Sequence, residues 1–555
     1  MTVDEDVWWK NVSVYQIWPA SFKDSNGDGV GDIPGIISTL DYVKSLGVDV
    51  IWLSPMYESP QEDMGYDISD YQKIHAAYGT MENMDNLILQ VHKRGMRLIL
   101  DLVINHTSVE HKWFQESRSS KLSPKRDWYI WKPPKYDVNG NRLPPNNWAS
   151  VFSGSAWEYD ELTDEYYLHI FAKGQPDLNW ENATTRQAIY DEAVTFWLEK
   201  GIDGFRIDTA AMYSKDQTFE DVSIVNPNCQ WQPCISMYQN GPRIHEFHKE
   251  MNEKTFSRYD VFTVGEIGSA GVEESLKYVS LKANELNMMF LFDMLGIGIG
   301  RPPISKDLVR FKRVIKKNFL LMDEGDGWST FYLENHDQPR SISVFGDDSP
   351  KYRERSGKLL ALLQTTLSGT LFLYQGQEIG MTNIPKDWPI ECYLDIESKN
   401  YFNENGMGSL DHINQLARDN GRTPVQWNGS KNAGFTTGEP WMKVNDNFPD
   451  VNVQAQEGDP KSLLVFWRRC LKMRKLYKNY FIHGKLNIID ENNEDVFYYS
   501  KQSGDRYAYV ALNFSRSRQK FVNHSSKNLQ LLVSNVPCSD YQWLEPFEGR
   551  VYLNE

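Results

Sequence analysis

The sequence predicts a (β/α)8 TIM barrel with an inserted domain after its third strand and a C-terminal antiparallel β-domain. Three observations support this fold class. Eight short apolar runs are typical of strands, amphipathic stretches that end in glycine separate several of them, and this alternation is interrupted once and then abandoned near the C-terminus. Strand and helix alternating eight times favours a parallel sheet closed into a barrel.

Each barrel strand is predicted where β-branched, aliphatic and aromatic residues gather in a short run. The candidate strands are residues 13–19, 49–55, 97–103, 204–208, 261–266, 286–292, 329–334 and 370–375. Helical stretches lie between strands, with apolar residues at helical spacing and a final glycine that favours a helix C-terminus. Examples are 36–47, 86–95 and 186–201.

Two departures from this alternation define the other domains. The third and fourth strands are separated by about 100 residues rich in Pro, Asn and aromatic residues, which is too long for a simple loop. After about residue 480 the runs become short and alternating, as in an antiparallel sheet. We therefore expect a barrel formed by 1–106 and 183–479, an inserted domain at 107–182 and a C-terminal β-domain at 480–555.

Composition excludes several classes of partner. A formal net charge of −16 opposes binding to a phosphate backbone, so nucleic acid is not expected. The most apolar stretch, 359–375, contains polar residues and is too short to span a bilayer, so no membrane association is expected. Five cysteines and an acidic N-terminus without a secretory pattern favour a cytoplasmic protein. We expect a monomer or a weak homo-oligomer.

Polar side chains stand where predicted strands end. They are Asp101, Asn105 and His106 at the third strand, Asp208 at the fourth, Glu266 at the fifth, and His336 and Asp337 at the seventh. The carboxyl ends of barrel strands meet on one rim, which predicts a shared active site. Arg206 and Asp208 share a strand face because side chains alternate, although a structural ion pair would also explain these two residues alone.

The acids on this rim favour glycoside hydrolysis, in which one carboxylate attacks the sugar and another donates a proton. Six segments then carry a resemblance. VYQIWPASFKDSNGDGVGD, MGYDISDY, DLVINH, GFRIDT, VGEI and ENHD, in this order, resemble the α-glucosidase branch of family 13 glycoside hydrolases, the α-amylase family, which includes oligo-1,6-glucosidases. The likeness covers almost the whole chain and implies a retaining enzyme that acts on a small α-glucoside without a catalytic cofactor.

The resemblance implies a role for each of three acids. Asp208 matches the nucleophile, and Arg206 on the same face is expected to keep the pKa of Asp208 low. Glu266 matches the general acid/base, with a pKa raised by apolar surroundings and by the charge of the nucleophile. Asp337 matches the carboxylate that stabilises the distorted sugar. A retaining enzyme would hold the Asp208 and Glu266 carboxyls about 5–5.5 Å apart.

Further residues match positions that bind sugar in this family. His106 and His336 match histidines that hydrogen-bond the reactive glucose, although each alone would also fit a buried structural histidine. Asp63 and Tyr66 match residues at the non-reducing end, and Arg422 is expected to pair with Asp63 and close the pocket, giving exo-action. Wall positions are matched by Phe152, Phe171, Gln175 and Phe292, for which plain packing is an equal alternative.

Thr209 bears on the choice of linkage. It follows the nucleophile directly, and threonine there resembles maltose-type members of the family, whereas isomaltose-type members usually carry valine. A hydroxyl offers a hydrogen bond to the leaving sugar that valine lacks. We therefore favour a maltase acting on α-1,4 links, with sucrose as a further candidate substrate.

Three alternatives stay open. An oligo-1,6-glucosidase would prefer isomaltose, a sucrose isomerase or glucosyltransferase would use the same carboxylates, and an inactive transporter subunit would share only the fold. The last would be expected to lack the acids that this chain retains.

The segment 24–35 resembles a calcium-binding loop. Asp24, Asn26, Asp28, the Val30 carbonyl and Asp32 fall at the first, third, fifth, seventh and ninth positions, with Gly29 at the sharp turn. The twelfth position is Gly35 and supplies no bidentate carboxylate, so we expect a weak structural Ca²⁺ site, with Mg²⁺ as the other candidate. A simple Asx-Gly turn is the alternative.

Overall fold

Eight parallel strands form the centre of the protein. A computed structural model describes residues 7–268, 270–294, 307–522, 529–538 and 540–554. In chain order the strands are β1 (Ser13–Ile17), β2 (Val50–Leu53), β5 (Arg97–Leu102), β11 (Gly204–Ile207), β12 (Phe262–Gly268), β13 (Met288–Leu291), β14 (Thr330–Phe331) and β15 (Thr370–Tyr374). They pair in the order β13-β12-β11-β5-β2-β1-β15-β14, and a parallel bridge between Met289 and Ser329 joins the two ends. The predicted barrel and all eight predicted strands are confirmed.

Side chains alternate between the barrel interior and the surrounding layer of helices, as the strand period of two requires. Val14, Trp52 and Phe290 belong to the buried interior cluster. Phe205 and Ile207 pack outward into the layer that the helices cover. Arg206 and Asp208 therefore face the interior of the barrel, which is the shared face that the sequence predicts.

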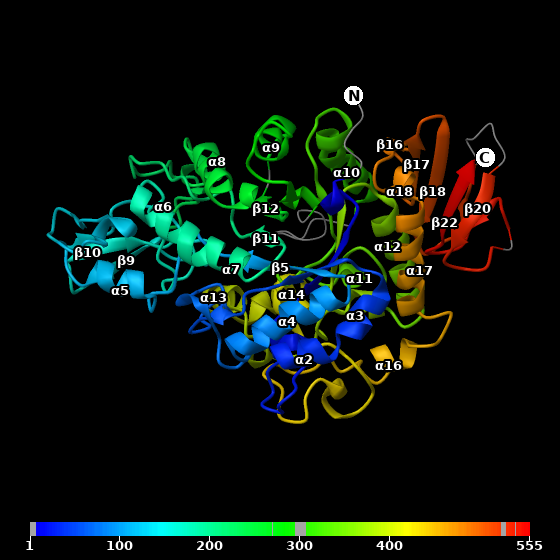
Figure 1. Ribbon diagram of the computed structural model, residues 1–555, viewed down its shortest axis with the longest axis horizontal. Coiled ribbons are helices and arrows are strands. Elements are labelled where there is room, and N and C mark those ends of the chain that lie inside the picture. Colours follow the sequence, from blue (N-terminus) through cyan, green and yellow to red (C-terminus); the bar gives the residue numbers. More distant parts are fainter. Residues whose placement is uncertain (1–6, 269, 295–306, 523–528, 539, 555) are drawn as a thin grey trace.

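Helices surround the sheet (Figure 1). The principal ones are α3 (Leu40–Leu46), α4 (Met81–Lys93), α6 (Ala183–Ile189), α7 (Phe196–Glu199), α8 (Ile244–Lys254), α9 (Val272–Val279), α10 (Leu308–Asp323), α12 (Arg353–Thr366) and α17 (Leu463–Leu476). A π-helical turn, η3 (Tyr190–Thr195), joins α6 to α7. The helix predicted at 36–47 is divided at Thr39, because α2 (Ile33–Ser38) ends there before α3 begins.

The chain between β5 and β11 builds a separate small sheet. Its antiparallel order is β6-β10-β9, with β6 (Trp131–Lys132), β9 (Trp157–Asp160) and β10 (Glu165–Leu168). This cyan part lies at one end of the molecule in Figure 1. Phe219, Cys234 and Tyr238, from the segment after β11, complete its core. The predicted inserted unit is present, while its limits at 107 and 182 stay a prediction.

The C-terminal part is an antiparallel sheet at the opposite end of the molecule (Figure 1). Its order is β16-β17-β18-β22-β20, with β16 (Lys485–Ile488), β17 (Val496–Ser503), β18 (Arg506–Asn513), β20 (Leu529–Ser534) and β22 (Gly549–Asn554). Lys312 of α10 is buried against this part of the chain and donates to the carbonyls of Asp490, Asn493 and Val496. The predicted β-domain is confirmed as a fold, and its start at 480 stays a prediction.

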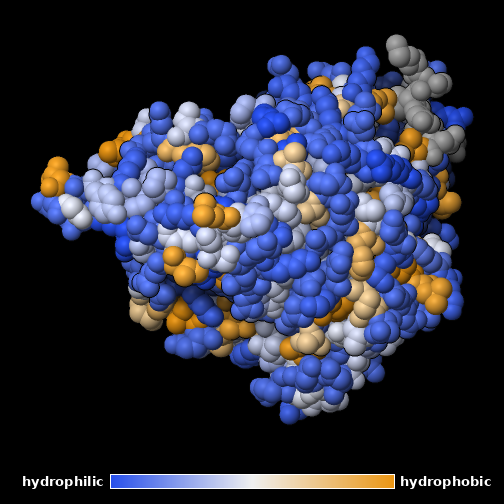
Figure 2. Space-filling view, turned by 60° about the vertical axis from the view of Figure 1, so that its left-hand side comes forward, coloured by the Kyte–Doolittle hydropathy of each residue, from blue (hydrophilic) through white to orange (hydrophobic). Residues whose placement is uncertain are grey.

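The outer surface is mainly polar. On the face shown in Figure 2, hydrophilic residues predominate and hydrophobic ones form small, separate groups. Across the described ranges, no helix has the length and apolar character needed to cross a membrane. All five cysteines are free thiols, two of them buried.

Candidate active site

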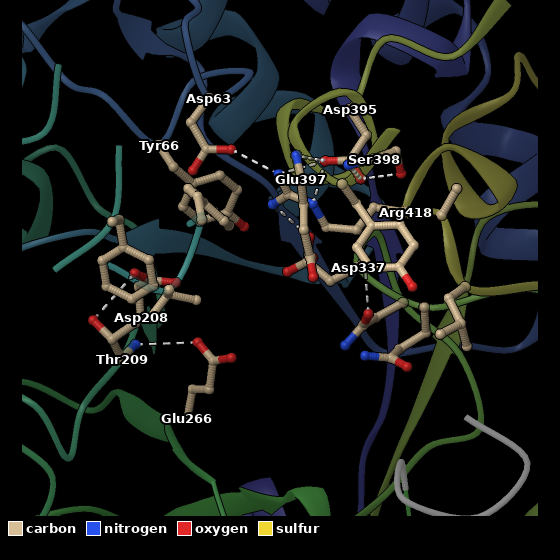
Figure 3. Close-up of a pocket in the computed structure, with 18 of the residues that line it drawn as sticks. Asp63, Tyr66, Asp208, Thr209, Glu266, Asp337, Asp395, Glu397, Ser398 and Arg418 are labelled. Atoms are coloured by element: carbon tan, nitrogen blue, oxygen red, sulfur yellow. Dashed lines mark hydrogen bonds and ion pairs between the residues drawn. The ribbon is translucent and has the colours of Figure 1, made fainter. Parts of the chain in front are cut away.

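A cavity of about 410 Å³ opens at the carboxyl ends of the barrel strands and has the size of a small-molecule site. Of the predicted site residues, it is lined by Asp63, Tyr66, His106, Phe152, Phe171, Asp208, Thr209, Glu266, Phe292 and Asp337. Figure 3 shows Asp208, Thr209 and Glu266 together on one side and Asp337 and Arg418 across the cavity from them. The structure thus gathers the three predicted acids around one space.

The Arg206 guanidinium lies beneath the cavity and forms hydrogen bonds to three carboxylates. Its Nη1 donates to Asp208 Oδ1 at 2.6 Å and to Asp101 Oδ1 at 2.8 Å, and its Nη2 donates to Glu266 Oε2 at 2.5 Å. The guanidinium is buried, and its fork holds Asp208 and Glu266 on different nitrogens. Gly204 begins β11 two residues earlier, where a Cβ would meet the Phe262 carbonyl oxygen at 1.9 Å, so the strand needs glycine to approach β12 this closely.

The pKa of Asp208 differs from the sequence-based prediction. Burial raises the pKa of Asp208 to about 6, even though the Arg206 guanidinium lowers it. The expectation of a low pKa is therefore wrong in direction. The physical reason is that Arg206 shares one charge among three carboxylates, and this does not offset the loss of water around Asp208. A pKa near 6 still leaves Asp208 mostly ionised at pH 7.

The pKa of Glu266 is raised, as expected for a general acid. Burial raises the pKa of Glu266 to about 7, Arg206 opposes this rise, and the charge of Asp208 adds to it. The direction agrees with the sequence-based expectation. Glu266 Oε2 also accepts a hydrogen bond from the Thr209 backbone N–H at 3.1 Å. Near neutral pH the pair therefore includes a state with Asp208 ionised and Glu266 protonated.

A second arginine, Arg418, organises the opposite side of the cavity. It contacts Asp63 Oδ1 at 3.0 Å, Asp395 Oδ1 at 2.7 Å and Asp337 Oδ1 at 3.5 Å. Its guanidinium also lies 5.1 Å from the centre of the Phe152 ring. Burial would raise the pKa of Asp337, but His336, Arg418 and Arg422 together hold it well below the usual range. Asp337 is therefore a fixed anion.

Arg422 does not pair with Asp63, contrary to the sequence-based prediction. Arg422 is fully buried and donates to Asp337 Oδ1 at 2.8 Å and to the His336 carbonyl at 2.9 Å. Arg418 takes the expected contact with Asp63 instead. Arg418 precedes the single turn α15 (Asp419–Arg422) and Arg422 ends it, so that Arg418 lines the cavity and Arg422 is buried behind it.

Three other predicted residues lie behind the cavity wall. His336 is buried, stacks on Tyr66 with ring centres 5.3 Å apart, and lies 3.0 Å from Asp337 Oδ2. Gln175 is buried and donates to Asp63 Oδ2 at 3.1 Å. With Arg206, these residues hold cavity-lining groups in place and do not themselves line the cavity.

Thr209 has an unusual backbone conformation. Its φ is +41°, in the left-handed region that β-branched residues rarely adopt. This conformation places the Thr209 N–H on Glu266 and the hydroxyl 3.3 Å from Asp208 Oδ2. The strain is located between the two acids, where such backbone outliers tend to be functional.

One wall of the cavity was not predicted from the sequence. It comes from the segment after β15 and consists of Asp395, Glu397, Ser398, Tyr401, His412, Ile413, Leu416, Ala417 and Arg418. This segment contains α13 (Ile396–Asn405) and α14 (Leu410–Leu416) and has a small core of its own, which includes Ile384, Trp388 and Tyr393. The only sequence signal was the long interval between the last predicted strand and the C-terminal domain, which marks a large loop on the same rim.

The predicted calcium loop satisfies its carboxylates internally. Asp24 accepts hydrogen bonds from the backbone of Asn26, Gly27 and Gly29 and from Thr436, and Asp32 caps α2 by accepting from Gly35. Asp28 accepts from Val30 N–H at 2.9 Å. In the part of the chain that the structure describes, no group of three or more His, Cys, Asp or Glu side chains is placed to hold a metal ion.

Fold, acids and cavity together define a glycoside-hydrolase site on a barrel, and the chain belongs to the alpha-amylase family, since residues 16–484 match the alpha amylase catalytic domain. An alpha-glucosidase of Candida albicans is 55% identical over 99% of this chain and 100% of its own length. An oligo-1,6-glucosidase of Saccharomyces cerevisiae is 46% identical over 99% of this chain and 98% of its own. A solved structure of an isomaltulose synthase variant from Erwinia rhapontici, in complex with sucrose, has a TM-score of 0.94 and 40% identity over 99% of both chains.

Proposed function

We propose that the protein is a retaining, exo-acting α-glucosidase that releases glucose from the non-reducing end of maltose and related α-1,4-glucosides. The observation that carries this proposal is the Arg206 fork, which holds Asp208 and Glu266 side by side with different proton affinities. A retaining glycosidase needs an ionised nucleophile next to a protonated acid. A fold that binds sugar without hydrolysing it has no need for this division.

In the first step, an Asp208 carboxylate oxygen attacks the anomeric carbon while Glu266 donates its proton to the glycosidic oxygen. The bond from the anomeric carbon to that oxygen breaks, the aglycone leaves as an alcohol, and a glucosyl ester with Asp208 forms. In the second step, Glu266 removes a proton from water, whose oxygen attacks the anomeric carbon and frees Asp208. Two inversions give net retention.

The opposite side of the cavity supports recognition of a terminal glucose. Asp63 and Asp337 are carboxylates held by Arg418, and such groups accept hydrogen bonds from sugar hydroxyls while the sugar ring distorts. The Asp63 and Arg418 pair links the loop after β2 to the loop after β15, two strands that only β1 separates, and favours a closed end. A closed end admits only a chain terminus, which is exo-action.

The proposed α-1,4 preference is supported by Thr209, which lines the cavity and whose hydroxyl donates to Asp208 Oδ2 at 3.3 Å. The similar chain named oligo-1,6-glucosidase keeps an α-1,6 enzyme as the second candidate. A kinetic panel of maltose, isomaltose, sucrose and maltotriose separates the two. We expect kcat/KM for maltose to exceed that for isomaltose by about tenfold or more, since one polar contact changes discrimination by about this amount. The reverse order would make the protein an oligo-1,6-glucosidase, and rearranged sucrose products would make it an isomerase.

The pH dependence of kcat/KM follows from the two acids. Asp208 must be deprotonated, so activity is lost as the pH falls through about 6. Glu266 must be protonated, so activity is lost as the pH rises through about 7. We expect a bell-shaped profile whose apparent pKa values belong to the coupled pair. In the Glu266→Gln variant, the pH profile of kcat/KM for an activated aryl glucoside should no longer fall at alkaline pH. An unchanged fall at alkaline pH would contradict the assignment of Glu266 as the acid.

A structural Ca²⁺ in the 24–32 loop is a separate proposal. It is supported by a ligand set made only of oxygens, the kind that Ca²⁺ prefers. Thermal unfolding in EDTA should shift upward on adding Ca²⁺, with about 2.7 kcal/mol of stabilisation at ~100 times the Kd. The Asp24→Asn variant should lose this response, and Mg²⁺ is the comparison ion. Identical melting curves with EDTA and with Ca²⁺ would show that the loop is an ordinary turn.

We also propose a cytoplasmic location and a monomer or weak homo-oligomer. Five free thiols support a reducing compartment. Cell fractionation and light scattering of the purified protein test these two statements.

A further inference from the structure

A row of buried polar side chains connects Lys215 with His106 behind the cavity wall. Lys215 Nζ lies 2.6 Å from Asn105 Oδ1 and 2.8 Å from Asp177 Oδ2. Asn105 Nδ2 lies 3.3 Å from Asp177 Oδ2 and 3.1 Å from His106 Nδ1. All four residues are buried, and of the four only His106 lines the cavity. The mechanism above gives no role to Lys215, Asn105 or Asp177.

The orientation of the Asn105 amide follows from its neighbours. An ammonium group only donates hydrogen bonds, so the Asn105 atom that faces Lys215 is the acceptor Oδ1. The NH2 group then points toward Asp177, which accepts, and toward His106 Nδ1. Lys215, a donor, and Asp177, an acceptor, therefore require the same orientation of the Asn105 amide. The opposite orientation would lose the hydrogen bonds to both.

This orientation decides where the His106 ring carries its proton. Burial lowers the pKa of His106, so the ring is neutral and has one N–H. His106 Nδ1 faces the Asn105 NH2 group and must accept, which leaves the proton on Nε2. Nε2 lies 3.1 Å from the Tyr66 carbonyl oxygen, which is an acceptor, and 3.2 Å from Gln175 Nε2, whose NH2 group also donates to Asp63 Oδ2. The Nε2–H tautomer pairs Nδ1 with the Asn105 NH2 group and Nε2 with the Tyr66 carbonyl, and leaves only the Gln175 contact without a hydrogen bond. The Nδ1–H tautomer would lose both of these pairs and gain only the hydrogen bond from Gln175.

We propose that Lys215, acting through Asn105, fixes His106 as the Nε2–H tautomer, whose N–H is shared between the Tyr66 carbonyl and a hydroxyl of the bound glucosyl unit. The inference rests on the proposed glucosidase function and deepens it. Lys215 and Asn105 are positioning residues, because they act on the sugar only through His106. Lys215 also joins the segment after β11 to Asp177, whose backbone forms an antiparallel bridge with His106.

An exchange of two side chains tests the tautomer. Asn105→Asp combined with Asp177→Asn keeps one carboxylate and one amide beside Lys215 and preserves their volumes. It also places an acceptor oxygen against His106 Nδ1, so the neutral ring must carry its proton there and Nε2 loses its own. We expect kcat/KM for maltose to fall by about 10- to 100-fold, the usual effect of losing one hydrogen bond to a buried polar group.

The pH profile separates this effect from a packing defect. As the pH falls, the ring of the exchanged variant gains a second proton and Nε2 donates again. The carboxylates of Asp63 and of the exchanged pair favour this protonation, and Lys215 opposes it. The ratio of kcat/KM in the variant to that in the parent should therefore rise toward acid pH, because the Asp208 limb is common to both. A ratio independent of pH would overturn the proposal.

Two further comparisons keep the test decisive if the exchanged variant is unstable. Lys215→Arg retains a donor for Asn105 and should keep at least about one third of the parent kcat/KM, whereas Lys215→Met with Asp177→Asn should show the loss. When His106→Ala is added to the latter pair, kcat/KM should be little lower than in His106→Ala alone, since all these changes act on the hydrogen bond from His106 to the sugar. Losses that multiply would overturn the proposal.

A matched control removes a buried ammonium elsewhere. Lys312→Met deletes three hydrogen bonds to the C-terminal part and should lower stability while leaving kcat/KM of the folded enzyme unchanged. A parent enzyme without α-glucosidase activity would count against the proposed function. Activity in the parent that is insensitive to Lys215 would count against the tautomer alone.

Discussion

The Asp208→Asn variant is expected to lose turnover of maltose by on the order of 10⁴-fold or more while it folds normally. The amide has nearly the same shape and can still contact Arg206, but its oxygen is a poor nucleophile and cannot form the glucosyl ester. Because the variant keeps the cavity, a glucose analogue should still bind. Steady-state kinetics, calorimetric binding and thermal unfolding measure these three properties separately.

A buried carboxylate outside the site provides the matched control. Asp160 is buried and pairs with Arg118 at 2.5 Å in the inserted segment, and it does not line the cavity. Asp160→Asn should lower stability by about 1–3 kcal/mol with kcat/KM within about twofold of the parent. If Asp208→Asn still hydrolysed maltose at an appreciable rate, another group would be the nucleophile.

The Glu266→Gln variant should show the second largest effect, and its size should depend on the leaving group. Maltose needs its glycosidic oxygen protonated, so kcat/KM for maltose should fall by about 10²–10⁴-fold, the usual contribution of general acid catalysis. An activated aryl glucoside leaves without a proton, so its first step should be nearly preserved. The ester should then accumulate, because water lacks a general base, and a burst of aryl alcohol should precede slow turnover.

A small anionic nucleophile distinguishes the two acids by the stereochemistry of the product. In Glu266→Gln, azide needs no general base, attacks the glucosyl ester from the α face and gives α-glucosyl azide. In Asp208→Ala, azide occupies the space of the missing carboxylate, attacks from the β face and gives β-glucosyl azide. Anomeric configuration by NMR is the readout. The same anomer from both variants would reject the division of roles.

The barrel was predictable because it depends on local patterns. Each strand is an apolar run of a few residues bounded by turn signals, and these patterns survive in any context. The ends were less predictable: the run at 13–19 stops at Ile17 because Pro19 begins a helical turn, α1 (Pro19–Phe22). The rim acids were predictable for a topological reason, since parallel strands bring their carboxyl ends to one edge.

Features that depend on long-range packing were not predictable. Arg418 meets Asp63 across 355 positions of sequence, and nothing local distinguishes Arg418 from Arg422 on the same helical turn. The pKa of Asp208 depends on how Arg206 is shared with Asp101 and Glu266, which requires knowing that all three converge. Sequence pattern identifies the groups, and folding decides how strongly they interact.

The segment that carries α13 and α14 has its own apolar core, separate from the cores of the barrel. Substitutions on its cavity-facing side can therefore reshape the sugar-binding space without loosening the strands that hold Asp208 and Glu266. The walls that select the sugar and the strands that carry Asp208 and Glu266 can therefore change separately, as long as Arg418 keeps its contact with Asp337. Changes in substrate preference among descendants of this fold should accumulate there first, at little cost to folding.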